Sequence, residues 1–277
     1  MPSLANHQSN EYTKLLILGD SKVGKTGSLA SLVTAGYKLR ILDFDNGLDV
    51  LSQYVLRDCP QNIDNIEFRT LRDDYKATEA GPVINGRPTA FISAIKMLDS
   101  WRYDDVDLGD PSSWGKEAIL VIDSLTFMSD AAFAFREPLT PRGKSGDYDK
   151  RATYKDAQDA IESVLALLTS GGFKTNVIII AHVRYVDNPD GTKKGYPVSV
   201  GSALSPTIPR YFNNVVRFTN GGKRQIETVS SPMFDLATAK PFEMPNKFSI
   251  ETGLADIFAI LRGEKTHKTQ PTKLRRA

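Results

Sequence analysis

Short and almost continuously apolar segments recur along the chain, and longer segments of helical periodicity separate them. Buried strands appear in a sequence as such unbroken apolar runs, whereas an amphipathic helix repeats its apolar residues every three to four positions. This pattern predicts strands at 14–18, 39–42, 66–71, 118–122 and 176–181, and helices at 25–35, 89–101, 153–169 and 256–261. Strands that alternate with helices indicate an α/β fold, with a mostly parallel sheet that carries helices on both faces.

Polar segments that contain glycine and proline connect these elements. Residues 75–88 and 104–114 are predicted to form loops. Two further polar stretches, 134–151 and 184–209, are longer than ordinary connections, and loops of that length are usually functional or mobile. The last third of the chain adds short β-like segments near 213–218, 224–229 and 235–239.

The chain is therefore expected to form one main domain with short extensions. The domain spans 13–263 and has a β-rich C-terminal section, a length that suits a single α/β unit. A polar lead at 1–12 precedes it, and a basic tail at 264–277 follows. Both extensions lack apolar periodicity and are predicted to be disordered.

Composition narrows the class of protein only slightly. The net charge is +2, so charge alone does not indicate a nucleic-acid-binding protein. The single cysteine, Cys59, excludes an internal disulfide, and the three histidines lie far apart without metal-ligand spacing. No apolar run reaches the ~20 residues of a membrane helix, and the polar lead does not resemble a secretory signal. The sequence therefore predicts a cytoplasmic protein with no membrane partner.

The first predicted strand runs directly into a segment that matches G-x-x-x-x-G-K-[ST] at every fixed position. In such a loop the glycines let the backbone wrap around phosphate groups, and the following helix adds its positive end. Lys25 is expected to reach the β- and γ-phosphates, and the Thr26 hydroxyl is expected to bind Mg²⁺. The predicted nucleotide-contacting residues are Gly19, Asp20, Ser21, Lys22, Val23, Gly24, Lys25, Thr26 and Gly27.

Hydrolysis of a nucleotide needs carboxylates as well as a phosphate loop. Asp123 ends the strand at 118–122, where a P-loop enzyme carries its second metal-binding group. Asp45 ends the second strand and is a candidate for the group that activates water. Asp43 lies two residues earlier and is the alternative. Both residues could instead be carboxylates that stabilise a turn.

Three segments resemble parts of RecA-type recombinases and follow one another in the same order. Residues 120–125 (LVIDSL) resemble the Walker B strand, and residues 42–49 (LDFDNGLD) resemble the second strand of that family. Residues 179–184 (IIAHVR) resemble the strand that carries its γ-phosphate sensor. Over roughly residues 14–262 the chain resembles the small RecA-core ATPases of bacteriophages, which are associated with single-strand annealing and recombination.

The resemblance implies a role for several single residues. Asp45 becomes the catalytic carboxylate, at a position where the larger recombinases have Glu. His182 becomes the γ-phosphate sensor, and Asp49 matches a residue that can touch the adenine. Lys240 would act as a basic finger on the ATP of a neighbouring subunit, although Phe242 stands where phage relatives often have an Arg. The alternative for Lys240 is an ordinary exposed lysine at the end of a strand.

The resemblance also implies partners. The family has DNA-binding loops at positions that correspond to about 126–152 and 184–209, so single-stranded DNA is the expected partner. A filament or ring of identical subunits is the expected assembly, and a single-strand binding protein is a further candidate. Basic side chains can neutralise phosphates and aromatic rings can stack on bases, but a solvated loop would look similar. The basic and aromatic residues concerned are Arg136, Arg142, Lys144, Lys150, Arg151, Arg184, Tyr185, Lys193, Lys194, Tyr196 and Arg210.

The sequence thus predicts a RecA-like, Mg²⁺-dependent ATPase that acts on single-stranded DNA in phage recombination or replication, with ATP and Mg²⁺ as cofactors. One alternative is a motor or assembly ATPase with a protein target, whose turnover would be indifferent to DNA. A second is a P-loop phosphotransferase, which lacks a recognisable lid or acceptor motif here. A third is a nucleotide switch, which has less need of Asp45, Asp123 and His182 together.

Overall fold

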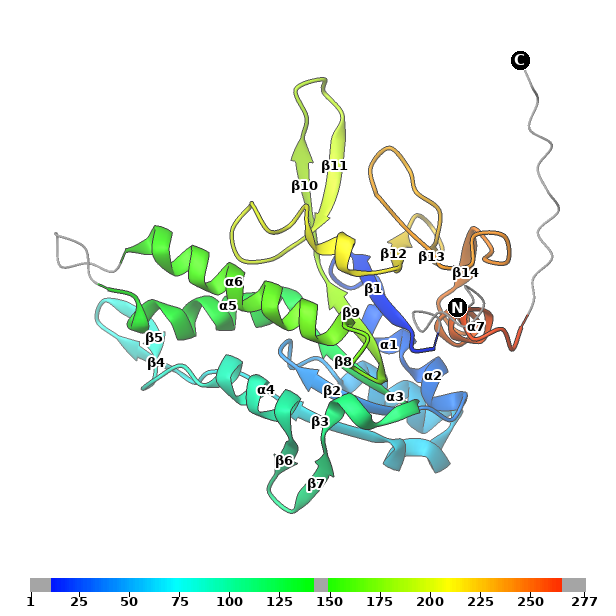
Figure 1. Ribbon diagram of the computed structural model, residues 1–277, viewed down its shortest axis with the longest axis horizontal. Coiled ribbons are helices and arrows are strands. Elements are labelled where there is room, and N and C mark those ends of the chain that lie inside the picture. Colours follow the sequence, from blue (N-terminus) through cyan, green and yellow to red (C-terminus); the bar gives the residue numbers. More distant parts are fainter. Residues whose placement is uncertain (1–10, 142–148, 266–277) are drawn as a thin grey trace, which may run out of the picture.

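The computed structural model describes residues 11–141 and 149–265, and within them an eight-stranded sheet forms the centre of the molecule (Figure 1). The strand order is β14-β13-β12-β1-β9-β8-β2-β3. The six strands from β12 to β3 are mutually parallel, whereas β13 and β14 are added antiparallel. The predicted α/β class, with a mostly parallel sheet and a β-rich C-terminal section, is therefore confirmed.

The five strands that were predicted from apolar runs, at 14–18, 39–42, 66–71, 118–122 and 176–181, all lie in this sheet. Three C-terminal strands extend it. Their bounds are β1 Lys14–Gly19, β2 Lys38–Asp43, β3 Ile66–Thr70, β8 Gly115–Asp123, β9 Thr175–Ala181, β12 Asn214–Asn220, β13 Arg224–Glu227 and β14 Lys247–Ser249. Three separate hairpins complete the strands: β4 Tyr75–Thr78 with β5 Gly81–Ile84, β6 Trp101–Tyr103 with β7 Val106–Gly109, and β10 Val183–Asp187 with β11 Lys193–Pro197.

Helices cover both faces of the sheet. They are α1 Lys25–Ser28, α2 Ala30–Thr34, α3 Asp49–Asp58, α4 Ala90–Asp99, α5 Leu125–Arg136, α6 Lys150–Thr169 and α7 Gly253–Leu261. Short 3₁₀ turns lie at Pro60–Asn65, Pro111–Ser113, Glu137–Leu139 and Ile208–Tyr211. No helix within the described parts of the chain has the length and apolarity to cross a lipid bilayer.

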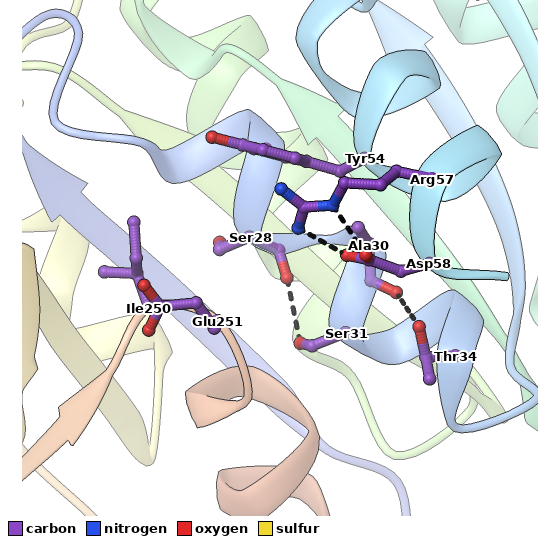
Figure 2. Close-up of a pocket in the computed structure, with 10 residues that line it drawn as sticks. Ser28, Ala30, Ser31, Thr34, Tyr54, Arg57, Asp58, Ile250 and Glu251 are labelled. Carbon is purple, nitrogen blue, oxygen red and sulfur yellow. Dashed lines mark hydrogen bonds and ion pairs between the residues drawn. The ribbon is translucent and has the colours of Figure 1, made fainter.

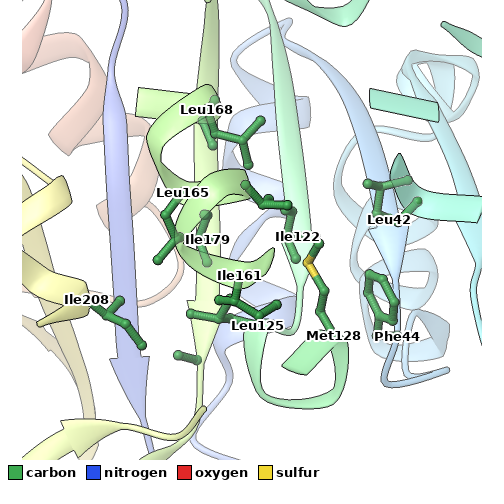
Figure 3. Close-up of a cluster of buried hydrophobic side chains, with 14 of the residues drawn as sticks. Leu42, Phe44, Ile122, Leu125, Met128, Ile161, Leu165, Leu168, Ile179 and Ile208 are labelled. Atoms are coloured by element: carbon green, nitrogen blue, oxygen red, sulfur yellow. The ribbon is translucent and has the colours of Figure 1, made fainter. Parts of the chain in front are cut away.

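The core consists of two apolar layers, one on each face of the sheet. Side chains alternate along a strand, so Leu16 and Leu18 of β1 enter the layer under α4, α5 and α6, and Ile17 enters the layer under α1 to α3 and α7. Figure 3 shows the first layer, in which Met128 of α5 and Ile161 of α6 pack on strand residues. Because both faces are covered, the middle portions of the central strands are apolar at consecutive positions, which explains their unbroken sequence pattern.

Several predicted connections contain regular structure. The first stretch expected to be a DNA-binding loop, 126–152, is helical over its first part, because α5 runs to Arg136, and again at its end, where α6 begins. The second, 184–209, contains the β10–β11 hairpin. Residues 142–148 of the first stretch, with Arg142 and Lys144, lie outside the described residues, as do most of the lead and tail.

Smaller differences follow from local packing. The predicted loops at 75–88 and 104–114 contain the strands β4, β5 and β7, and the predicted helix at 25–35 is divided at Leu29. The segment at 235–239 is not a strand, although Ala237 forms an isolated bridge to Val215.

A partly buried lysine at the beginning of β1 makes the stability of the fold depend on pH. Lys14 Nζ donates hydrogen bonds to the carbonyls of Phe173 and Thr175, at 2.8 and 2.7 Å. Burial lowers the pKa of Lys14 from 10.5 to about 7. Unfolding returns the ammonium to water, so between these two values the unfolded chain binds more protons than the folded one, and stability rises with pH.

We therefore expect the difference in unfolding free energy between wild type and Lys14→Met to change steadily in favour of wild type from pH 7 to pH 10. Below pH 7 both states hold the proton, and the difference should be constant. Urea unfolding at several pH values measures it. A difference that is the same at every pH would show that Lys14 has an ordinary pKa in the folded chain.

Candidate active site

The candidate site residues gather at one edge of the sheet. The parallel strands β1, β2, β8 and β9 all end there, and the chain leaves them at Gly19, Asp43, Asp123 and Ala181. Ligands of open α/β sheets bind beyond the carboxyl ends of the strands, so this edge is where a site is expected. Residues that lie 161 positions apart in the chain, such as Ser21 and His182, thus become neighbours.

The loop between β1 and α1 has the backbone shape of a phosphate cradle. Lys22 and Gly24 both adopt left-handed backbone conformations, with φ of 64° and 101°. Glycine tolerates such a φ without strain, which explains Gly24 at this position. Gly27 is needed for a different reason, because a Cβ there would lie 2.6 Å from the ring of Tyr54.

Lys25 lies inside this loop with its ammonium group turned toward the backbone. Its Nζ donates to the carbonyl oxygens of Gly19 and Asp20, at 2.9 and 2.8 Å. The side chain is buried, and this burial lowers its pKa, an effect that the nearby Asp123 and Asp45 carboxylates oppose. An ammonium group that is partly removed from water and lies at the N-terminus of a helix attracts an anion with several negative charges.

Thr26 and Asp123 form the second part of the site. The Thr26 hydroxyl donates to Oδ2 of Asp123 at 2.6 Å, although the two residues belong to α1 and β8. Asp123 is almost completely buried, and burial raises its pKa to about 7. Mg²⁺ prefers oxygen ligands and keeps several waters, so a hydroxyl and a carboxylate at this spacing fit the ion.

The protein supplies too few ligands to hold such an ion alone. No three His, Cys, Asp or Glu side chains in the described ranges 11–141 and 149–265 gather as a metal site. Phosphate oxygens of a nucleotide would complete the ligand set, as they do in nucleotide-hydrolysing enzymes generally.

Asp45 is held in a fixed orientation after the end of β2, which is three positions from β1 in the sheet. Its Oδ1 accepts a hydrogen bond from the Ser124 hydroxyl at 2.7 Å, and its Oδ2 lies 3.3 Å from Nε2 of His182. Burial would raise the pKa of Asp45, but the hydrogen bonds from His182 and Ser124 outweigh it, and the pKa is lowered. The carboxylate is therefore ionised at neutral pH and can accept a proton.

Asp43, the alternative candidate, is committed to the structure of the strand end. Its Oδ1 accepts the backbone N–H of Asn46 at 2.8 Å, and its Oδ2 accepts the Thr70 hydroxyl at 2.9 Å. The side chain is only 1% exposed. Asp43 therefore stabilises the turn after β2, while Asp45 faces the site.

His182 joins the phosphate loop to the carboxylate. Its Nδ1 lies 3.3 Å from the Ser21 hydroxyl and 3.5 Å from Nζ of Lys25. An ammonium can only donate, so Nδ1 is the acceptor, and the ring proton lies on Nε2 and points to Asp45. The imidazole thus connects Lys25 and Asp45 through its two nitrogens.

A pocket beside the phosphate loop extends the site (Figure 2). It has a volume of about 140 Å³ and lies between α1–α2, α3 and the segment at Ile250–Glu251. The Tyr54 ring forms one wall of the pocket. The Arg57 guanidinium lies over this ring, 5.1 Å from the centre of the ring. An aromatic wall next to Gly27 suits a planar group attached to the phosphates.

The β10–β11 hairpin begins at the site and projects from the body of the molecule (Figure 1). It starts one residue after His182, and the Tyr185 hydroxyl donates to Oδ2 of Asp20 in the phosphate loop at 3.1 Å. Tyr185 also packs edge-to-face on Phe234, whose ring occupies the space beside Gly195. The hairpin is therefore in contact with the phosphate loop at its base.

Lys240 is the one candidate that the fold does not bring to this edge. The N–H of Ala239 donates to Oδ1 of Asn214, which is the first residue of β12 and pairs with Leu15 near the beginning of β1. Lys240 thus lies toward the opposite edge of the sheet, and its Nζ is 3.4 Å from Glu243. Lys240 therefore does not contact the described site of its own subunit, and the alternatives that remain are a role toward another subunit and an ordinary lysine without a catalytic role.

Three contacts of the site were not predicted from sequence. Ser124 orients Asp45, Ser21 contacts His182, and Thr126 accepts the N–H of His182 on its hydroxyl at 3.1 Å. Ser124 follows directly on Asp123, so the Asp-Ser pair was a usable signal. The other two depend on contacts between distant segments.

A phosphate loop with Lys25 and Thr26 at the start of a helix, and Asp123 at the end of a parallel strand, defines a P-loop ATPase. The comparisons agree with this class, since the AAA domain family matches residues 11–236. The chain belongs to that family.

Two further comparisons are less informative. A prototypical ATPase from the type III secretion system of pathogenic bacteria is similar at 15% identity, with a TM-score of 0.37. The match covers 76% of this chain and 53% of that ATPase, so the chain spans about half its length. No curated protein sequence matches the chain.

Proposed function

We propose that this P-loop ATPase is a RecA-like protein that couples Mg²⁺-dependent hydrolysis of ATP to the binding of single-stranded DNA, in phage recombination or replication. The observation that carries the proposal is the direct connection between the nucleotide site and a projecting hairpin. His182 contacts Lys25 and precedes β10 by one residue, and Tyr185 bonds to the phosphate loop. A change at the γ-phosphate would therefore reach the hairpin through two contacts.

In the proposed reaction each side chain has a separate task. Lys25 would leave the carbonyls of Gly19 and Asp20 and bind the β- and γ-phosphates. Mg²⁺, held through Thr26 and Asp123, would neutralise charge on the phosphate oxygens. Asp45 would orient the attacking water and accept its proton. His182 would keep that carboxylate in position through a hydrogen bond from its Nε2–H group. The base would enter the pocket beside Tyr54.

The hairpin has one face with the chemistry that single strands require. Arg184 lies opposite Tyr196, and Val186 lies opposite Lys194, so two cations and one ring share a face. Arg184 is exposed, and no described residue forms an ion pair with it. On the other face Tyr185 packs on Phe234, and Lys193 pairs with Asp187 at 3.7 Å. Cations bind phosphates and rings stack on bases, so the first face is the proposed contact surface.

We expect the double variant Arg184→Ala/Tyr196→Ala to lose most of its affinity for a fluorescent oligonucleotide. Loss of a stacked base costs about 1–3 kcal/mol, and loss of one phosphate contact reduces the log–log salt slope by about 0.7. Lys193→Ala, on the opposite face, is the matched control and should bind as wild type does. His182→Ala should still bind DNA, but without dependence on a non-hydrolysable ATP analogue.

The decisive measurement is ATP turnover with and without single-stranded DNA, together with this binding assay. Stimulated turnover and salt-dependent binding would support the proposal. The contrary result is that wild type binds no single strand in either nucleotide state and hydrolyses ATP at the same rate with and without DNA. That result would show that the protein acts on another target, and a motor or assembly ATPase would become the better account.

A homo-oligomer, a filament or ring, belongs to the same proposal. Its support is the position of Lys240, which lies away from its own subunit's phosphate loop and would meet a nucleotide only across an interface. A single-strand binding protein and a place in the cytoplasm are also parts of the proposal that follow from the expected DNA partner.

A further inference from the structure

A second cleft with basic walls lies between the edge strand β3 and helix α4, away from the phosphate loop. We call it the β3–α4 cleft, and it has a volume of about 290 Å³. Strand β3 is four positions from β1 in the sheet, so at ~4.8 Å per strand the cleft is roughly 19 Å from the phosphate loop. It is therefore a separate cavity from the site described above.

The polar side chains that line the cleft are either cations or hydroxyl groups, and Leu71, Ala90 and Met97 are its apolar lining residues. Four are cationic, namely Arg69, Arg72, Lys96 and Arg102, and none of the described lining residues is acidic. Arg69 and Arg102 pair with Asp104 and Asp107 of the β6–β7 hairpin. Those four side chains are between 45% and 79% exposed, and ion pairs so exposed contribute little, so both guanidinium groups stay available.

One face of α4 presents donors without partners. Thr89, Ser93 and Lys96 line the cleft at a spacing of four and three residues, which puts them on one side of the helix. Neither the two hydroxyls nor the Lys96 ammonium forms a hydrogen bond or ion pair with any described side chain. The backbone N–H groups at the N-terminus of α4 are not available to a ligand, because Oδ1 of Asp73 accepts hydrogen bonds from the N–H groups of Thr89 and Ala90.

Arg72 joins the cleft to the candidate active site. Its Nη1 donates to the backbone carbonyl of Asp45 at 3.2 Å, which leaves most of its five N–H donors available. Its guanidinium also lies 6.0 Å from the centre of the Phe127 ring, and that ring packs edge-to-face on His182.

We propose that the β3–α4 cleft binds a phosphate group, which Thr89, Ser93 and Lys96 hold from the side of α4 and Arg72 holds from the segment that follows β3. A phosphate has more acceptor oxygens than a carboxylate. It can therefore accept hydrogen bonds from the guanidinium of Arg72, the ammonium of Lys96 and two hydroxyl groups at the same time. The phosphate can come from free inorganic phosphate or from the backbone of a nucleic acid. The inference does not depend on the proposed function of the hairpin.

The test uses the whole chain with its phosphate loop saturated by a non-hydrolysable ATP analogue and Mg²⁺, so that added phosphate cannot bind at the γ-phosphate position. Inorganic phosphate is titrated at constant ionic strength while Tm is recorded, since a ligand of the folded state raises Tm in a saturable way. We expect Ser93→Ala/Lys96→Ala to weaken this binding about tenfold or more. Lys38→Ala, an exposed lysine at the beginning of β2, should match wild type, and Lys96→Arg should keep the binding.

A second arm identifies the source of the phosphate. The salt dependence of oligonucleotide binding is compared between wild type and Ser93→Ala/Lys96→Ala. A log–log slope smaller by about 0.7 would assign the cleft to nucleic-acid phosphate. An unchanged slope with a weakened phosphate titration would assign it to free phosphate. If the double variant changes neither arm, the cleft is not a phosphate site. If wild type binds no oligonucleotide but the phosphate arm responds, this inference stands while the DNA proposal fails.

Discussion

Lys25→Ala is expected to abolish ATP turnover while the protein remains folded. The ammonium is the only cation that bonds within the phosphate loop among the described residues, and it contacts Gly19 and Asp20 through their backbone oxygens. Without it, nothing in the loop neutralises charge on the β- and γ-phosphates as the bond to the γ-phosphate breaks. Lys25 forms no ion pair with a described carboxylate and bonds chiefly to backbone carbonyls, so the fold should tolerate the change.

Turnover of ATP by the purified variant, with circular dichroism as the check on folding, measures this effect. Lys22→Ala is the matched control, because Lys22 belongs to the same loop but is exposed and forms no contact with the site. It should retain nearly full activity. Wild-type turnover by the folded Lys25→Ala protein would show that the loop is not the catalytic phosphate site.

Asp45→Asn is expected to bind ATP normally but to hydrolyse it roughly a hundredfold more slowly or worse, the usual range for loss of a general base. The amide keeps the shape of the side chain and can still pair with Ser124 and His182, so the geometry should survive. What it loses is the ability to take a proton from water. A normal affinity with a reduced kcat is therefore the expected pattern.

Asp43→Asn separates this role from a merely structural one. Asp43 accepts hydrogen bonds from Asn46 and Thr70, so its replacement should lower Tm more than it lowers kcat per folded molecule. The assignment of the base to Asp45 would fail if Asp45→Asn hydrolysed ATP at the wild-type rate. In that case Asp43 would be the next residue to consider.

The sequence predicts the sheet and the phosphate loop well because both depend on local patterns. Strands buried on both faces are almost continuously apolar, as in residues 177–181, and the phosphate loop needs fixed residues at fixed spacing. The carboxylates at strand ends follow from the same logic, since parallel strands end at one edge. These features need no knowledge of which segments meet in space.

Helix α5 and the hairpin were predicted less well, although each has a local signal. Residues 125–136 repeat apolar positions at helical spacing, and Met128 and Ala132 are buried. Residues 188–191 read Asn-Pro-Asp-Gly between two alternating segments, a pattern typical of a hairpin turn. Residues 184–209 were instead predicted to form a loop because of their polar composition, and residues 126–133 because of the resemblance.

The remaining contacts could not be predicted from sequence in physical terms. Tyr185 reads as a ring available for stacking, yet its hydroxyl bonds to Asp20 and its ring packs on Phe234. Those contacts join segments separated by 165 and by 49 positions, and their distance in space depends on the whole fold. A role for a single exposed aromatic therefore needs the structure.

The two hydrogen-bonded strands of the β10–β11 hairpin determine what kind of motion the nucleotide can cause. A flexible loop would respond to the γ-phosphate by becoming ordered, but paired strands move together as a rigid arm. The ring of Phe234 occupies the space beside Gly195, which pairs with Tyr185 at the middle of the paired strands. The paired segment is about 17 Å long, at ~3.4 Å for each of five residues, so a rotation of the hairpin near His182 would move its tip further than its base. Hydrolysis would change the direction in which the tip points, and a pair of spectroscopic labels at the tip and on α6 would follow that rotation.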